Sequence, residues 1–96
     1  MKQIWKYPLK ITEEQQILMP RQAKILSAGL DPHGELCVWA LVDPARPVHI
    51  RRFRIFGTGH PFEDTLWALV ASVLVHPFMW HVFIFEIEGA QVEITK

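Results

Sequence analysis

The segment Asp31-Pro32-His33-Gly34 constrains the fold more than any other part of this chain. Asp favours the first position of a β-turn, Pro presets φ at the next position, and Gly accepts a positive φ. Apolar, partly β-branched segments flank this turn at residues 24–30 and 35–43. The pattern therefore predicts a β-hairpin.

Other segments also favour strands. At the N-terminus Trp5, Tyr7, Leu9 and Ile11 alternate with lysines and a proline, which is typical of a strand with one apolar face. Beyond a second turn, residues 48–56 are expected to add a third strand to the sheet of the hairpin. We expect another strand at residues 80–87 and a short last one at 91–95.

Two segments are ambiguous. Residues 12–15, Thr-Glu-Glu-Gln, resemble a capping box and predict a short helix that Pro20 would stop, although residues 16–19 are equally compatible with a strand. Residues 66–75 are apolar on every side and rich in Val, which suits either a helix or a buried strand.

The predicted fold class is all-β and mainly antiparallel. We expect a single domain over residues 1–96, built as a small meander, open barrel or sandwich of about six strands with at most one short helix. Residues 65–85 lack Asp, Glu, Lys and Arg over a length that would span a bilayer. His76, Pro77 and His81 are costly inside a membrane, so two strands joined by a turn explain the segment better.

Charge and cysteine content narrow the function classes. Ten basic and ten acidic side chains give a formal charge of zero, so the whole chain has no long-range attraction to nucleic acid or anionic lipid. Neither is expected as a partner, and an anion site would require local clustering. The single Cys37 excludes an internal disulfide and suits a reducing cytoplasm; its apolar neighbours predict a packed side chain.

Apolar content predicts self-association. Half of the residues are hydrophobic, and a small domain has little interior in which to bury them. A well-filled monomer core is the alternative, but the surplus favours a homo-oligomer, most simply a two-fold dimer.

Five elements recur together in a known family: residues 4–9 (IWKYPL), 23–27 (AKILS), 39–44 (WALVDP), 52–60 (RFRIFGTGH) and 80–83 (WHVF). From Ile4 to Phe85 the chain resembles small uncharacterised proteins encoded by bacteriophages and prophages, and it departs from them in its longer C-terminal tail. The resemblance favours a strand at residues 66–75 and carries over no catalytic residue. It implies a phage setting, where genes of this size often encode inhibitors of host defence.

Arg52 and Arg54 form one candidate anion site. On a strand they share one face, about 7 Å apart, while Arg51, Phe53 and Ile55 share the other. Two guanidinium groups at this spacing suit a phosphate or carboxylate pair. A solvated charged face is the alternative interpretation.

The segment Gly57-Thr58-Gly59-His60 follows directly. Two glycines allow backbone N–H groups to converge on an anion, with the Thr58 hydroxyl and His60 as further donors. The segment is neither a Walker loop nor a dinucleotide-binding fingerprint, and a glycine bend is the structural alternative.

Aromatic residues supply a third candidate set. Trp5, Trp39, Trp67 and Trp80 fall on four predicted strands, where most are expected in the core. The candidates for a pocket or an interface are Trp5, Tyr7, Trp39 and Trp80. Trp and Arg side chains dominate interface hot spots. The histidines show no metal-ligand spacing, and no nucleophile motif is present, so neither a cofactor, a metal nor a catalytic residue is assigned.

These observations lead to one hypothesis with two alternatives. The first is a phage-encoded, non-enzymatic binding protein that antagonises host defence by sequestering a nucleotide-derived immune signal, with Arg52 and Arg54 on the phosphates. The alternatives are direct inhibition of a host defence protein and a small nucleic-acid-binding accessory role.

Overall fold

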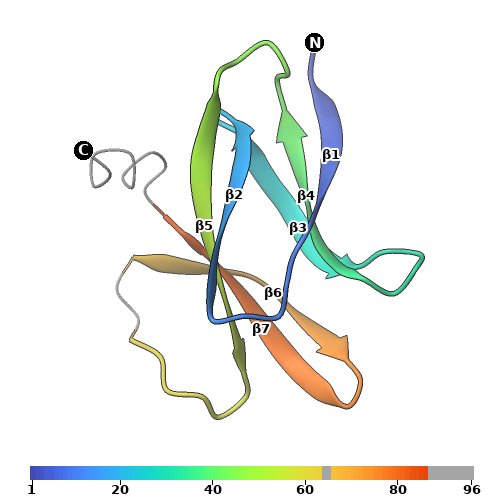
Figure 1. The fold of residues 1–96 in the computed structure, drawn as a ribbon, viewed down its shortest axis with the longest axis vertical. Helices are drawn as coiled ribbons and strands as arrows, with labels where there is room; N and C mark the ends of the chain where they lie inside the picture. Colours follow the sequence, from blue (N-terminus) through green and yellow to red (C-terminus); the bar gives the residue numbers. More distant parts are fainter. Residues whose placement is uncertain (64–65, 87–96) are drawn as a thin grey trace.

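The computed structural model describes residues 1–63 and 66–86, which form seven strands and no helix. The strands are β1 (Gln3–Pro8), β2 (Glu14–Pro20), β3 (Lys24–Leu30), β4 (Leu36–Val42), β5 (Val48–Gly57), β6 (Trp67–Val75) and β7 (Phe78–Phe85). Every pairing is antiparallel (Figure 1). The predicted all-β antiparallel fold class is confirmed.

The strands form two sheets that pack as a small sandwich. One sheet has the order β1-β4-β3 and the other has the order β2-β5-β7-β6. Strand β3 also packs against β6, which brings the two sheets together along one side. This two-sheet arrangement agrees with the predicted small sandwich or meander.

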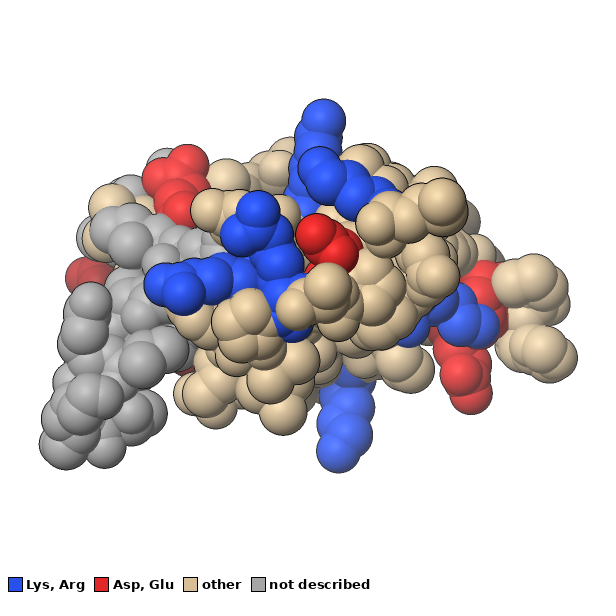
Figure 2. Space-filling view, turned by 90° about the horizontal axis from the view of Figure 1, so that it is seen from above, with Lys and Arg blue, Asp and Glu red and all other residues tan. Residues whose placement is uncertain are grey.

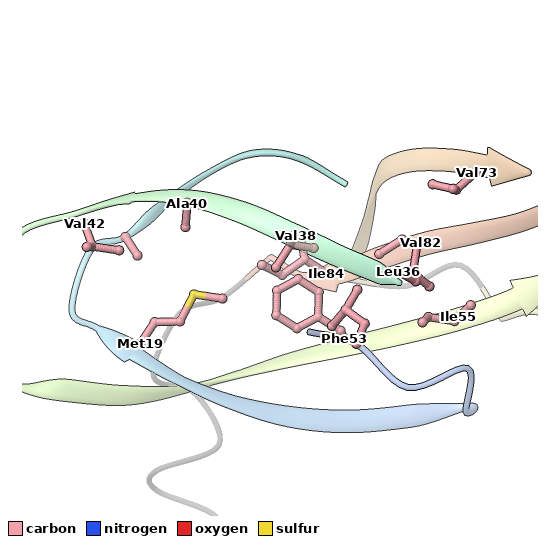
Figure 3. Packing of buried hydrophobic residues seen from close by; sticks show 12 residues of the cluster. Met19, Leu36, Val38, Ala40, Val42, Phe53, Ile55, Val73, Val82 and Ile84 are labelled. Atoms are coloured by element: carbon pink, nitrogen blue, oxygen red, sulfur yellow. The ribbon is translucent and has the colours of Figure 1, made fainter. Parts of the chain in front are cut away.

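Alternation along the strands sends one set of side chains between the sheets (Figure 3). Val38, Ala40 and Val42 of β4 are fully buried, and so are Phe53 of β5 and Val82 of β7. Burying one such Val or Phe side chain stabilises a fold by about 1.5–3 kcal/mol. This shared core holds the two sheets together.

The predicted hairpin at Asp31 is confirmed as β3 and β4. Asp31 Oδ1 accepts hydrogen bonds from the N–H groups of His33 and Glu35, both at 2.9 Å, and Gly34 has a φ of 82°. Asp31 Oδ2 lies 2.9 Å from Lys6 Nζ, although this carboxylate is almost fully buried. The turn is therefore attached to β1 as well as to its own hairpin.

Of the two alternatives for this segment, the short helix at residues 12–15 is wrong, and the strand at residues 16–19 is confirmed as part of β2. The Gln15 side chain accepts a hydrogen bond from Lys10 N at 3.0 Å and donates one to Lys10 O at 2.7 Å, which closes a loop. Directly after this loop β2 pairs with β5, in a register that places Glu14 opposite Arg54. Pairing with β5 satisfies the backbone in the extended form, so local helix capping does not decide the structure.

The assignment of residues 48–56 to the sheet of the hairpin is also wrong. Strand β4 already has β1 on one side and β3 on the other, so it has no free edge for β5. The chain instead crosses at residues 43–47 into the second sheet, where β5 pairs with β2 and β7.

Strands β6 and β7 form the hairpin predicted for the charge-free segment, and the strand interpretation of residues 66–75 is confirmed. A register shift between Leu69 and Ala71 makes a bulge in β6. The strand predicted at residues 91–95 lies outside the described residues.

Candidate ligand-binding site

The turn that follows β5 closes on itself. Gly57 N donates to His60 Nδ1 at 2.9 Å, and His60 N donates to Gly57 O at 3.1 Å. Gly59 occupies the left-handed region with a φ of 93°. Two of the backbone N–H groups predicted to face an anion are therefore used inside the turn.

This turn also sets the chemistry of His60. Because Nδ1 accepts the Gly57 N–H, the neutral imidazole carries its proton on Nε2. The exposed His60 ring can therefore donate a hydrogen bond from Nε2. The Thr58 hydroxyl, the other predicted donor, lies 2.8 Å from His81 Nε2.

His60 and Trp80 together form a wall shared by two pockets. Their ring centroids are 6.3 Å apart. The first, which we name the loop pocket, has a volume of about 330 Å³ and is lined by Ile11, Thr12, Glu13, Ile55, Phe56, His60, Pro61 and Trp80. The second, the hairpin-tip pocket, has a volume of about 420 Å³ and is lined by Gly57, Thr58, His60, Pro77, Phe78, Met79 and Trp80.

Arg52 and Arg54 lie elsewhere, on the outer face of the four-stranded sheet. Arg52 Nε lies 2.8 Å from Glu14 Oε2, and Arg54 Nε lies 3.1 Å from Glu14 Oε1. The Arg54 guanidinium is 4.5 Å from the centre of the Trp67 ring. Neither arginine lines either pocket, so the structure does not join them to the Gly57–His60 turn.

Glu14 partly neutralises this arginine pair. Partial burial alone would raise the pKa of the Glu14 carboxyl, but the hydrogen bonds and charges of Arg52 and Arg54 outweigh it and lower the pKa. The Glu14 carboxylate thus occupies the position between two guanidinium groups where an external anion was predicted to bind.

Aromatic side chains continue from the arginines across the same outer face. Phe62 packs between Phe56 and Phe83, at centroid distances of 4.7 and 4.5 Å, and Trp67 packs on Phe85 at 5.2 Å. We call this surface the aromatic–arginine face; it comprises Glu14, Arg52, Arg54, Phe56, Phe62, Trp67, Phe83 and Phe85. Sequence reasoning missed its phenylalanines, although the alternation at residues 81–85 indicated Phe83 and Phe85.

A chain of hydrogen bonds crosses the sheet beside this face. Ser72 Oγ lies 2.7 Å from His81 Nδ1, and His81 Nε2 lies 2.8 Å from Thr58 Oγ1. Both ring nitrogens are thus bonded to hydroxyl groups. In these contacts no carboxylate holds the imidazole as an Asp does in a Ser-His-Asp triad.

The remaining predicted aromatic residues lie on the three-stranded sheet. Trp5 and Tyr7 are on β1, and Tyr7 packs against the core, where burial raises the pKa of its hydroxyl. Trp39 is half-buried on β4, and Trp5 keeps 37% of its surface exposed. Only Trp67 among the four tryptophans is buried, so the expectation that most lie in the core is wrong.

Other chemistry receives little support from the described residues. Among them, no group of three or more His, Cys, Asp or Glu side chains is placed to hold a metal ion. Cys37 is buried as predicted, and burial raises the pKa of its thiol, which disfavours the reactive thiolate. Within residues 1–63 and 66–86 no helix has the length and apolar character needed to cross a membrane.

Comparison with known proteins identifies a family. No curated protein and no solved structure matches the chain. A family model described as a domain of unknown function, DUF7352, matches residues 1–91. Because this match covers nearly the whole sequence, the chain belongs to the DUF7352 family.

Proposed function

We propose that this chain is a phage-encoded, non-enzymatic binding protein of the host cytoplasm that antagonises host defence by sequestering a small nucleotide-derived signal. The observation that carries the proposal is the pair of pockets that share His60 and Trp80. The phage setting rests on the sequence resemblance over residues 4–85.

The loop pocket suits a nucleobase. Trp80 and Phe56 offer aromatic surface, and about 330 Å³ lies at the lower end of the volumes typical of small-molecule sites. The Glu13 carboxylate and the Thr12 hydroxyl can accept hydrogen bonds from exocyclic amino groups of a base. A base-sized cavity that combines apolar surface with a few polar groups is the usual form of such a site.

The hairpin-tip pocket has a mostly apolar lining, and the polar part of the same ligand is assigned to its Thr58–His60 side. It is lined by Thr58 and His60, and the Nε2–H of His60 can donate to a phosphate oxygen. Arg52 and Arg54 are not part of this site, because Glu14 already binds both of them. Phosphate recognition therefore falls to the Gly57–His60 turn and not to the arginines.

Titration calorimetry with AMP, ADP-ribose and a cyclic dinucleotide tests this function. We expect one of these probes to bind, and Glu13→Gln and His60→Ala to weaken its binding at least tenfold. Glu35→Gln, an exposed carboxylate change in the β3–β4 turn, serves as the matched control and should bind normally. Equal binding by all four proteins would refute the site, and no binding of any probe would count against the nucleotide class.

A second candidate function is direct inhibition of a host protein through the aromatic–arginine face. Arg52 stacks on both Trp67 and Phe85, at 5.4 and 5.0 Å, and Leu69 beside them is exposed. Aromatic and Arg side chains of this kind are enriched at interface hot spots. If this function is correct, Leu69→Glu should abolish protection of an infecting phage while Glu13→Gln leaves it intact.

The same face would be buried in the proposed homodimer. Native mass spectrometry distinguishes the two uses, because Leu69→Glu should convert a dimer into a monomer. A chain that is already monomeric would leave this face for a foreign partner and would contradict the dimer.

A further inference from the structure

Basic and acidic residues balance over the whole sequence, but the fold gathers several basic residues at one end of the molecule. Four basic residues surround the loop at residues 43–47 that joins β4 to β5, at the end of the sandwich that also holds the N-terminus (Figure 1). We call this surface the basic end; it comprises Lys2, Arg21, Lys24 and Arg46. Figure 2 looks onto it and shows basic side chains spread around an acidic one.

Register and hydrogen bonds place these four residues together. Lys2 precedes Gln3, which pairs with Val42, and Lys24 pairs with Leu41 on the other side of β4. Arg21 N donates to Pro47 O at 2.7 Å, which joins the β2–β3 turn to the same loop. Lys2 and Lys24 are therefore about two strand spacings apart, roughly 10 Å.

Little negative charge opposes them. Asp43 lies in the same loop, and its carboxylate is 3.8 Å from Arg46 Nε in a pair that is partly exposed. Within residues 1–63 and 66–86, Lys2, Arg21 and Lys24 form no ion pair. The basic end thus has three unneutralised positive charges beyond the Arg46–Asp43 pair.

An aromatic surface adjoins the basic end on the outer face of the three-stranded sheet. Val38, Ala40 and Val42 point into the core, so Trp39 and Leu41 point outward. Trp39 is a diagonal neighbour of Lys24 on this face, about 7–8 Å away. Ile4, opposite Leu41, is 61% exposed.

We propose that the basic end and the adjoining Trp39 surface bind a single-stranded nucleic acid. Lysine and arginine side chains from separate elements would contact successive phosphates, and Trp39 would stack on an unpaired base. A single strand fits better than a duplex, because only unpaired bases can reach an aromatic side chain on a sheet. The zero net charge does not oppose this inference, since the cations act at one end of the molecule.

Fluorescence anisotropy with a labelled oligothymidylate tests the proposal. Contacts by the three unneutralised cations predict that the logarithm of the association constant falls as the logarithm of the salt concentration rises, with a slope of about −2.1, or about −0.7 per contact. Arg21→Gln and Lys24→Gln should each reduce the magnitude of the slope by about 0.7. Lys10→Gln, in the β1–β2 loop at the other end, is the matched control and should not change it.

Further measurements separate base stacking from charge and nucleic acid from an acidic protein. Trp39→Leu should weaken binding by about fivefold or more, with an unchanged salt slope, because stacking and charge contribute separately. A thermal melt of this variant verifies that it folds. Equal affinity for a duplex of the same length, or tighter binding of polyglutamate than of oligothymidylate, would overturn the proposal; the latter would assign the surface to an acidic protein.

Discussion

Lys6 on β1 holds the carboxylate of Asp31, with Lys6 Nζ 2.9 Å from Asp31 Oδ2, although the Asp31 side chain is only 3% exposed. The Lys6 hydrogen bond, followed by that from the Glu35 N–H, lowers the pKa of Asp31 from 3.8 to about 2. This contact joins an edge strand to the turn that organises the neighbouring hairpin.

Acid should therefore destabilise the protein partly through Asp31. Because its pKa is lower in the folded state, this carboxylate contributes its stability fully above about pH 4, and the contribution is lost as pH falls from 3.8 towards about 2. Urea unfolding at pH 6 and at pH 2.5 should show this loss. In Asp31→Asn the difference between the two pH values should be smaller; an unchanged difference would show that Asp31 does not couple folding to pH.

Glu13 and Glu14 are adjacent carboxylates with different predicted roles. Glu14→Gln removes the carboxylate that binds Arg52 and Arg54, so the free energy of unfolding should fall by about 1 kcal/mol, the scale of partly exposed ion pairs. Glu13→Gln should leave it unchanged and weaken ligand binding instead, because Glu13 lines the loop pocket. Calorimetric melts and binding isotherms of both variants test this division, and the reverse pattern would contradict it.

Substitutions of the two glycines in the Gly57–His60 turn should have different effects on ligand binding and on stability. A Cβ at Gly57 would lie 3.1 Å from His60 Cε1, so Gly57→Ala should displace the His60 ring and weaken ligand binding more than stability. A Cβ at Gly59 would meet no atom within 4 Å, but this residue has a φ of 93°. Gly59→Ala should therefore lower the free energy of unfolding by about 1 kcal/mol through backbone strain. Equal effects of both substitutions on binding would argue against a role for the His60 position.

Phe53 is the largest fully buried side chain and contacts the core from β5. Phe53→Ala should reduce the free energy of unfolding by about 3–5 kcal/mol, because it leaves a cavity between the sheets. Leu69→Ala, on the exposed outer face, should cost less than about 1 kcal/mol. Chemical denaturation compares the two, and a mild effect at Phe53 would mean that the sheets pack differently.

Local chemistry explains which parts of the fold were predictable. The hairpin at Asp31 depends on residues next to one another, and the alternation of Arg51, Phe53 and Ile55 with Arg52 and Arg54 depends only on strand geometry. Sheet membership of β5 depends on whether β4 has a free edge, which involves strands distant in sequence. Propensities within a segment contain no information on that competition.

The site was predictable to a similar extent. The Gly57–His60 turn and Trp80 do meet, because β5 and β7 are paired and Gly57 lies opposite Trp80. The contacts of Glu14 with Arg52 and Arg54 were not predictable, because they depend on the pairing of β2 with β5. The sequence at Glu14 resembles the start of a helix. The burial of Arg51 was not predicted either. Its guanidinium group donates a hydrogen bond to Ala23 O at 2.9 Å, and Ala23 belongs to a different segment of the chain.

Native mass spectrometry of the protein purified from phage-infected cells with active defence tests the central claim most directly. The pockets at His60 and Trp80 predict an extra non-covalent mass that unfolding releases as a nucleotide, and that is absent from His60→Ala and present in Glu35→Gln. A protein of bare polypeptide mass from the same cells, with protection of the phage intact, would contradict the account.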